Sequence, residues 1–117
     1  MTVEDTELDV LSSAAHWAFV QDILTVDKTA HTIKLRLTIT AECFVQVYVN
    51  VQKSIVSYTL VFNRSRIYGR DCDGGNWHRH PAEAPEQHDF SAEGRRTVSL
   101  DEFLRETQQV LQARGLL

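Results

Sequence analysis

Three of the five histidines lie in one short stretch, Arg70 to Phe90, which reads RDCDGGNWHRHPAEAPEQHDF. One residue separates His78 from His80, and His88 follows further along the same stretch. Pro81 biases His80 toward an extended backbone, and side chains two residues apart on an extended chain point to the same side. We therefore predict that the imidazoles of His78 and His80 share one side of the chain.

Histidines in this pattern are compatible with three kinds of structure. Together with Asp71, they could hold zinc or another divalent cation that keeps one coordination position open. Alternatively, a histidine could transfer protons near neutral pH while Arg70 or Arg79 stabilises phosphoryl charge. In the third interpretation, Trp77 packs over the end of a sheet and the histidines hydrogen-bond backbone carbonyls in a stiff loop. The candidate catalytic residues are His78, His80, His88 and Arg70, and the candidate metal ligands are His78, His80, His88 and Asp71.

The two cysteines do not indicate a reactive site. Cys72 stands between Asp71 and Asp73, whose charges are expected to raise the pKa of its thiol and so disfavour a thiolate nucleophile. Cys43 falls within an alternating strand pattern and is interpreted as a packing or surface residue. Two cysteines are also too few for a disulfide framework, which favours a cytosolic protein.

The histidine stretch follows a region that is typical of β-strands. Three segments alternate apolar and polar residues with a period of two: TIKLRLTIT (32–40), FVQVYVNVQ (44–52) and IVSYTLVF (55–62). A fourth segment, RIYGR (66–70), leads directly into the histidines. Short links favour antiparallel hairpins, because a parallel crossover needs about a dozen residues or more.

Helices are predicted at both ends of the chain. At the C-terminus, Ser99 and Glu102 have the spacing of a capping box, and Gly115 can form a left-handed cap. The apolar stripe of this helix is expected to pack on the sheet; it consists of Leu100, Phe103, Leu104, Thr107, Val110 and Leu111. Near the N-terminus we predict a helix over 6–16 and a strand over 19–26, while residues 17–26 also fit a continued helix. The whole chain, 1–117, is then a single α+β domain, an antiparallel meander sheet of four or five strands with the N- and C-terminal helices packed on one face.

This arrangement leaves the second face of the sheet open to water or to a partner. Residues 28–79 carry eight Lys and Arg against three Asp and Glu, although the net charge of the chain is −4. Cations that meet phosphates, mixed with rings that stack on bases, suit an RNA strand. The candidate RNA-binding residues are Lys34, Arg36, Tyr48, Arg66 and Tyr68, and Arg70 is predicted to share their face. A homodimer interface on this face is the alternative.

Other features of the sequence exclude several functions. The longest apolar runs are too short to span a membrane, and the acidic start MTVEDTELD is unlike a signal or transit peptide. The chain contains no Gly-x-Gly-x-x-Gly, phosphate-loop lysine motif or nucleophile elbow. We therefore expect no membrane contact and no nucleotide-binding loop of these types.

The run FVQVYVN…YTLVFNRSRIYGRDCDGGNWHRHPAEAPEQH, followed by a helix beginning SLDEFL, resembles the TumE-like family of small prokaryotic toxin–antitoxin proteins. The resemblance covers residues 32–111, and its matching positions are Asp71, His78, His80 and His88. It implies a growth-inhibiting toxin partnered by a small helix-turn-helix antitoxin, with RNA as the target of cleavage.

Three functions therefore remain open from the sequence. The first is a toxin that acts on RNA, which would make the protein a ribonuclease. The second is a non-catalytic binding or regulatory module that uses the open face for a homodimer or partner interface. The third is a small histidine-rich protein that binds a divalent metal.

Overall fold

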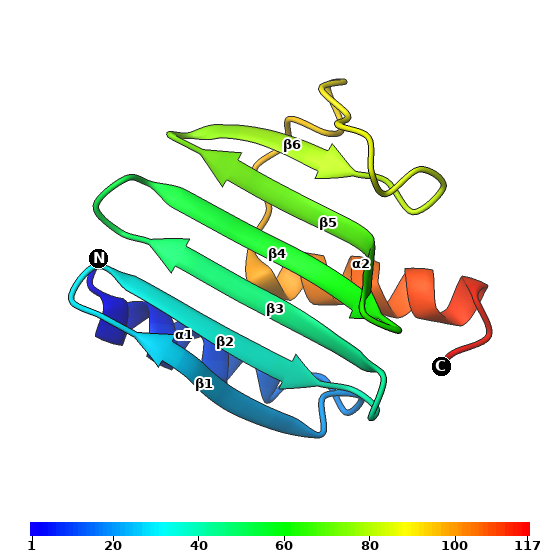
Figure 1. The fold of residues 1–117 in the computed structure, drawn as a ribbon, viewed down its shortest axis with the longest axis horizontal. Coiled ribbons are helices and arrows are strands. Elements are labelled where there is room, and N and C mark those ends of the chain that lie inside the picture. The colour runs from blue at the N-terminus through cyan, green and yellow to red at the C-terminus, as the bar shows by residue number, and fades with distance from the viewer.

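A computed structural model describes all 117 residues as one sheet with two helices behind it (Figure 1). The elements are α1 (Val3–Ala14), β1 (Asp22–Lys28), β2 (Thr32–Thr38), β3 (Cys43–Asn50), β4 (Ile55–Phe62), β5 (Ser65–Asp73), β6 (Asn76–His80) and α2 (Leu100–Ala113). The strands pair in sequence order, and every pair is antiparallel. The predicted α+β meander is confirmed, but it has six strands rather than four or five.

The sixth strand contains the first two histidines. A two-residue turn at Gly74 and Gly75, both with positive φ, joins β5 to β6, and such turns match the twist of a hairpin. The turn was predicted, but the strand after it was assigned to a loop. Its sequence, NWHRH, has no apolar alternation, so only the pairing with β5 reveals it as a strand.

The N-terminal helix and strand are confirmed in kind, with shifted ends. Thr2 caps α1, because its hydroxyl accepts a hydrogen bond from the Asp5 backbone at 3.1 Å and the Asp5 carboxylate accepts one from the Thr2 backbone at 3.0 Å. The helix therefore begins at Val3 rather than at residue 6. The strand runs over 22–28 instead of 19–26, and the alternative of a helix continuing through 17–26 was wrong.

The predicted C-terminal helix is confirmed together with its caps. Ser99 and Glu102 exchange two hydrogen bonds of 3.1 Å in a capping box. Gly115 adopts a φ of 71°, and the Leu116 backbone N–H donates to the Leu111 carbonyl at 2.8 Å, which closes the helix end. The predicted stripe faces the sheet: Leu100, Phe103, Leu104, Thr107 and Leu111 are buried, and Val110 is partly buried.

Both helices lie behind the same face of the sheet in Figure 1, and the core fills the space between them and the strands. Alternate residues of the central strands point into this core, including Leu35, Leu37 and Val45, each with 0% of its surface exposed. Burial of each such side chain stabilises the fold by roughly 1.5–3 kcal/mol. The residues between them point to the uncovered side of the sheet, which we call the open face.

A β-bulge in β5 changes which side chains reach the open face. Where β4 advances by one residue, β5 advances by two, so Ile67 is an extra residue in the ladder. As a result, Arg66 stays on the open face while Tyr68 and Arg70 point toward the helices. Their exposed fractions are 5% and 0%. The predicted placement of Tyr68 and Arg70 on the open face was therefore wrong, because a bulge breaks the period of two.

Arg70 is held in a buried ionic network beneath α2. Its guanidinium lies 2.8 Å from a carboxylate oxygen of Glu106 and 2.8 Å from one of Glu93, and it also donates to the Glu93 backbone carbonyl at 2.7 Å. Tyr68 donates its hydroxyl to Glu106 at 2.7 Å, and burial raises the pKa of this phenol to about 12. Arg70 and Tyr68 therefore join the sheet to the C-terminal part of the chain.

Candidate metal centre

The three histidines of the motif meet on the open face. His78 and His80 both project from β6, and their ring centroids are 5.1 Å apart. The ring of His88 lies 4.9 Å from that of His78 and 4.7 Å from that of His80. One nitrogen from each ring forms a set in which all three atoms lie within 4.8 Å of one another. The prediction that His78 and His80 share one side is confirmed.

A short antiparallel bridge brings His88 back to β6. The backbone N–H of Arg79 donates to the Asp89 carbonyl at 3.1 Å, and that of Asp89 donates to the Arg79 carbonyl at 2.7 Å. Because side chains alternate along paired strands, the neighbours of these two residues point to the same face. The Arg79 guanidinium also binds the Asp89 carboxylate, with contacts of 2.9 and 2.7 Å. Arg79 thus anchors the loop and lies on the side away from the histidines.

Asp71 lies across the ladder from His78 and completes the cluster. Its Oδ2 atom is 3.4 Å from His78 Nε2 and 3.3 Å from His80 Nε2, while Ser57 donates a 2.7 Å hydrogen bond to Oδ1. Ligands about 2.05 Å from a tetrahedral cation are separated from one another by about 3.3 Å. The Asp71 carboxylate therefore lies near ligand spacing from each of these two imidazoles, while the set of nitrogens that could share one cation is that of the three histidines.

His80 is held in the form that binds metals. Its Nδ1 lies 2.9 Å from the Pro85 carbonyl, which can only accept a hydrogen bond, so this nitrogen carries a proton. Burial and then the charge of Arg66 lower the pKa of His80, which keeps the ring neutral at physiological pH. A neutral ring protonated at Nδ1 leaves Nε2 with a free lone pair, and Nε2 is the atom that faces Asp71.

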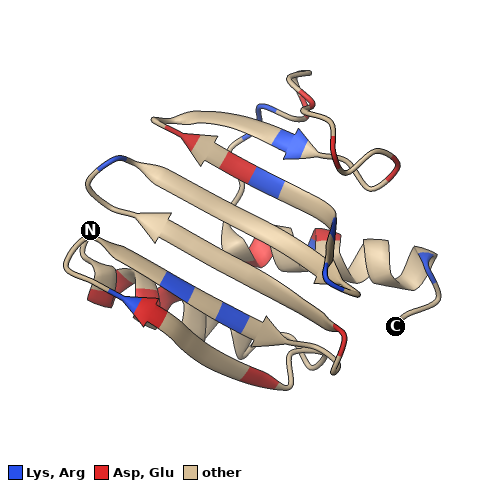
Figure 2. Cartoon of the chain, in the orientation of Figure 1, with Lys and Arg blue, Asp and Glu red and all other residues tan.

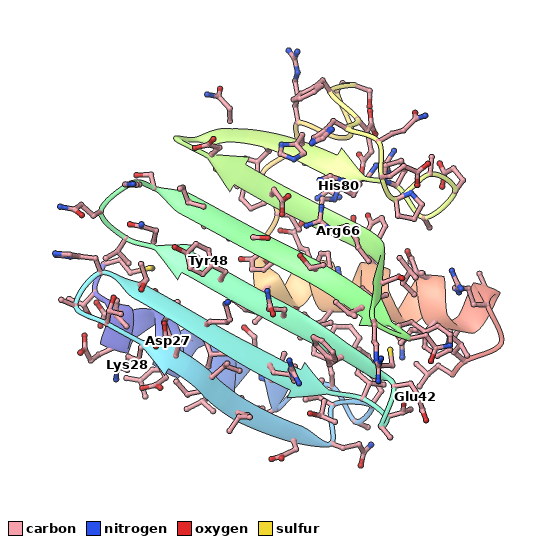
Figure 3. All side chains as sticks on the ribbon, viewed as in Figure 1. Asp27, Lys28, Glu42, Tyr48, Arg66 and His80 are labelled. Carbon is pink, nitrogen blue, oxygen red and sulfur yellow. The ribbon has the colours of Figure 1, made fainter.

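Arg66 supplies a cation beside the histidines. Its guanidinium lies 3.6 Å from the Asp71 carboxylate and donates to the Thr59 hydroxyl at 3.4 Å, with 33% of the side chain exposed. Figure 3 shows Arg66 and His80 close together over β5 and β6. A shallow hollow of about 430 Å³ opens here, lined by Ser65, Arg66, His80, Pro85 and Glu86. An anionic group could enter it and contact Arg66.

The structure brings together four of the predicted site residues, Asp71, His78, His80 and His88, and separates Arg70 from them. The predicted catalytic role of Arg70 is not compatible with its position on the helix-covered face. Lys34, Arg36, Tyr48 and Arg66 share the open face with the histidines, as their pairing register shows, whereas Tyr68 does not.

Three contributors to the site were not predicted from the sequence: the Ser57 hydroxyl, the Pro85 carbonyl and the Phe90 ring. Phe90 lies 5.5 Å from His78 and is nearly parallel to His88, with its centroid 6.1 Å away. Its place two residues after His88 was a usable signal, because the two share a face on an extended segment. The contacts of Ser57 and Pro85 depend on strand register and loop path, which the sequence pattern did not specify.

Gly94 fixes the loop that carries His88, which leads to a testable prediction. A Cβ atom at Gly94 would collide with the backbone carbonyl of Asp89. We expect Gly94→Ala to lower the free energy of unfolding by about 1–3 kcal/mol, the usual range for overpacking, and to displace His88. Urea unfolding and the imidazole NMR signals test this, with Ala92→Ser in the same loop as the control. Unchanged stability and an unchanged His88 signal in Gly94→Ala would contradict it.

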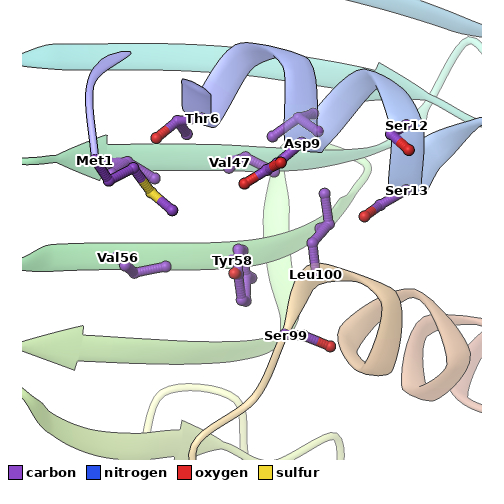
Figure 4. A pocket seen from close by; sticks show the side chains of 12 residues that line it. Met1, Thr6, Asp9, Ser12, Ser13, Val47, Val56, Tyr58, Ser99 and Leu100 are labelled. Carbon is purple, nitrogen blue, oxygen red and sulfur yellow. The ribbon is translucent and has the colours of Figure 1, made fainter. Parts of the chain in front are cut away.

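An apolar hollow of about 410 Å³ lies on the opposite face of the sheet, between α1 and the start of α2 (Figure 4). Val47, Val56 and Tyr58 form its floor, and the hydroxyl groups of Ser13 and Ser99 lie at its walls. Burial raises the pKa of Tyr58 to about 12, so this phenol stays protonated. The hollow contains no cluster of metal ligands, and the group of three histidines lies on the open face.

Fold and site together define this chain as an α+β protein with an antiparallel meander whose open face carries three histidines and an aspartate. Searches of protein-family models, curated proteins and solved structures found no match to it. The resemblance to TumE-like proteins therefore stays a prediction. None of the helices has the length and apolar character needed to cross a membrane.

Proposed function

We propose that this protein is a metal-dependent hydrolase that cleaves phosphodiester bonds in RNA. The observation that carries the proposal is the convergence of three imidazole nitrogens within 4.8 Å of one another, with the Asp71 carboxylate 3.4 and 3.3 Å from two of the rings. Imidazoles with a carboxylate are a suitable set for zinc and other divalent transition metals. His88 is exposed to solvent, so the cluster can be reached from the open face.

The surrounding residues have separate roles in this proposal. A bound cation would supply an acidified water and neutralise developing charge. Arg66 would hold a non-bridging phosphate oxygen, and Ser57 would keep Asp71 oriented toward the rings. In the reaction, the water oxygen bonds to phosphorus and the bond from phosphorus to one ribose oxygen breaks. One proton of the water ends on that ribose oxygen, and the other passes to solvent.

A second candidate mechanism uses the histidines directly as acid and base. The 3.4 Å contact of Asp71 with His78 favours it, because a carboxylate beside an imidazole orients the ring for proton transfer. The substrate would be the same, but no cation would be required.

Removal of metal distinguishes the two mechanisms. The protein purified without an affinity tag is expected to contain about one divalent cation per chain by elemental analysis. Chelation should abolish cleavage of a single-stranded RNA, and addition of zinc, manganese or nickel should restore it. Full cleavage by the chelated protein would instead support direct proton transfer. Absence of both bound metal and cleavage would refute both mechanisms.

We also propose that the protein is the toxin of a toxin–antitoxin pair. The resemblance in residues 32–111 supports this setting, in which RNA cleavage inhibits growth and a helix-turn-helix partner relieves the inhibition. Growth of a host that expresses the protein then provides a readout of the same site in the cell.

A further inference from the structure

Two rows of paired residues cross the open face and end at the histidines. The first row is Lys34, Tyr48, Ser57, Asp71 and His78, and the second is Arg36, Gln46, Thr59, Gly69 and His80. Each row passes from β2 to β6. With about 4.8 Å between neighbouring strands, each row is about 19 Å long.

The charges on these rows are concentrated at their ends. Figure 2 shows basic residues on β2 and β5, whereas β3 and β4 between them have no charged residue. The far end carries Lys34 and Arg36, and the histidine end carries the Asp71 carboxylate with the Arg66 guanidinium 3.6 Å from it. Asp27 pairs with Lys34 in the register, so an acidic side chain shares this end of the open face.

The middle of the rows provides uncharged polar groups and one aromatic ring. Gln46, Ser57 and Thr59 offer hydrogen-bonding groups, and Tyr48 lies between Lys34 and Ser57 in the first row. Figure 3 labels Tyr48 on β3. Such a surface suits a nucleic-acid strand whose phosphates contact the cations at both ends and whose bases lie on the polar and aromatic side chains between them.

Arg36 is prepared to bind an anion. Its guanidinium lies 4.0 Å from the centre of the Phe44 ring, and its Nε atom is buried without a hydrogen-bond partner. A buried donor without a partner is costly, and a shift of the side chain toward an anionic oxygen would satisfy it. An open hollow of about 730 Å³ beside it is also lined by Arg64 and Glu42.

We infer that the open face binds a single strand of RNA that runs across the β-strands along these rows. One phosphate lies at Arg66 and the histidines, another lies at Lys34 and Arg36, and Tyr48 stacks on a base between them. A length of about 19 Å corresponds to a short segment of about four nucleotides, the low end of single-strand site sizes. A duplex does not fit, because its stacked bases cannot lie on Tyr48. The inference rests on the proposed function, since RNA is the substrate proposed for the histidine cluster.

Fluorescence anisotropy with a labelled ten-nucleotide RNA tests this path, using chelated protein so that cleavage does not interfere. Lys34→Gln/Arg36→Gln is expected to lower the slope of log affinity against log salt by about 0.7, because the two side chains contact one phosphate and each lost phosphate contact contributes about 0.7. Tyr48→Leu should weaken binding at least roughly fivefold through lost stacking. The matched control, Lys53→Gln/Arg105→Gln, removes two exposed charges elsewhere and should keep the wild-type slope.

Each outcome decides the inference. Equal slopes for wild type and Lys34→Gln/Arg36→Gln, or equal affinity for duplex and single strand, would overturn it. A homodimer that covers the open face would also overturn it. Sedimentation would then show a dimer for wild type and a monomer for Lys34→Gln/Arg36→Gln. Single-stranded DNA of equal affinity would broaden the ligand to any single strand and overturn RNA as its identity. If the variants bind RNA as wild type does and the protein still cleaves it, the binding path is wrong and the proposed hydrolase activity remains. If RNA binds along the path but is not cleaved, the binding path remains and the proposed hydrolase activity is wrong.

Discussion

Replacement of both His78 and His80 by alanine is expected to abolish metal binding, RNA cleavage and growth inhibition while the sheet remains folded. Loss of a residue that only orients a metal ligand costs about 10- to 100-fold in affinity. Removal of two ligands should therefore reduce metal affinity by more than about 100-fold. Titration calorimetry, an RNA cleavage assay and growth of an expressing host measure the three effects, and circular dichroism reports the fold.

His80 needs a second variant, because it also contributes to structure. Only 5% of its surface is exposed and its ring hydrogen-bonds the Pro85 carbonyl, so alanine leaves a cavity and an unsatisfied carbonyl. His78→Gln/His88→Gln removes two more accessible ligands and keeps His80 in place. His16→Ala/His31→Ala, at exposed positions outside the cluster, is the matched control. Wild-type cleavage and toxicity in both cluster variants would contradict the assignment of this site.

The strands and helices could be predicted because their signals are local. Alternation over 32–62 marks three strands whose inward residues are buried in β2 and β3 and buried or partly buried in β4, and the capping box at Ser99 marks the start of α2 to the residue. The missed strand, β6, has no hydrophobic signal of its own. It exists because the turn at Gly74 and Gly75 returns the chain along β5, so its stability comes from pairing rather than from propensity.

The candidate site could be predicted only as far as alternation remains unbroken. His78 and His80 flank Arg79 on a regular strand, so their common side followed from the sequence. The same rule failed in β5, where one extra residue moved Tyr68 and Arg70 to the other face. The charge excess of residues 28–79 was misleading for a related reason, since it counted Arg70 and Arg79, which the structure pairs with acids from the acidic C-terminal part.

Arg70→Met is expected to lower the free energy of unfolding by about 3–5 kcal/mol, the usual cost of removing one partner of a buried ion pair. The Glu106 carboxylate, 17% exposed, would lose its buried cation and keep only the half-exposed Arg96 guanidinium at 2.9 Å and the Tyr68 hydroxyl as donors. Methionine fills a similar volume, so the loss is mainly electrostatic. Urea unfolding measures the change. Metal affinity of the folded protein should remain, because Arg70 lies on the face away from the histidines.

Two further variants test whether the loss of stability comes from the buried charge or would follow any substitution nearby. Arg70→Met/Glu106→Gln should recover part of the lost stability, because the Glu106 carboxylate, which only Arg96 would still neutralise, is then also removed. Arg105→Met is the control on α2: Arg105 is 60% exposed and lies 3.9 Å from Asp101, so its loss should change stability by less than about 0.5 kcal/mol. Equal effects of Arg70→Met and Arg105→Met would contradict a special role for Arg70.

The acid stability of the protein provides an independent test of the same network. Hydrogen bonds from Arg96 and then from Arg70 lower the pKa of Glu93 from 4.5 to about 2. An acid with a lowered pKa in the folded state stabilises the fold above its unfolded pKa and loses this contribution as the pH falls through the folded value. Wild type should therefore lose stability from about pH 4.5 to pH 2, and Arg70→Met should lose less in this range, because only Arg96 then lowers the pKa of Glu93. Parallel acid unfolding curves for the two proteins would show that Arg70 does not interact with Glu93.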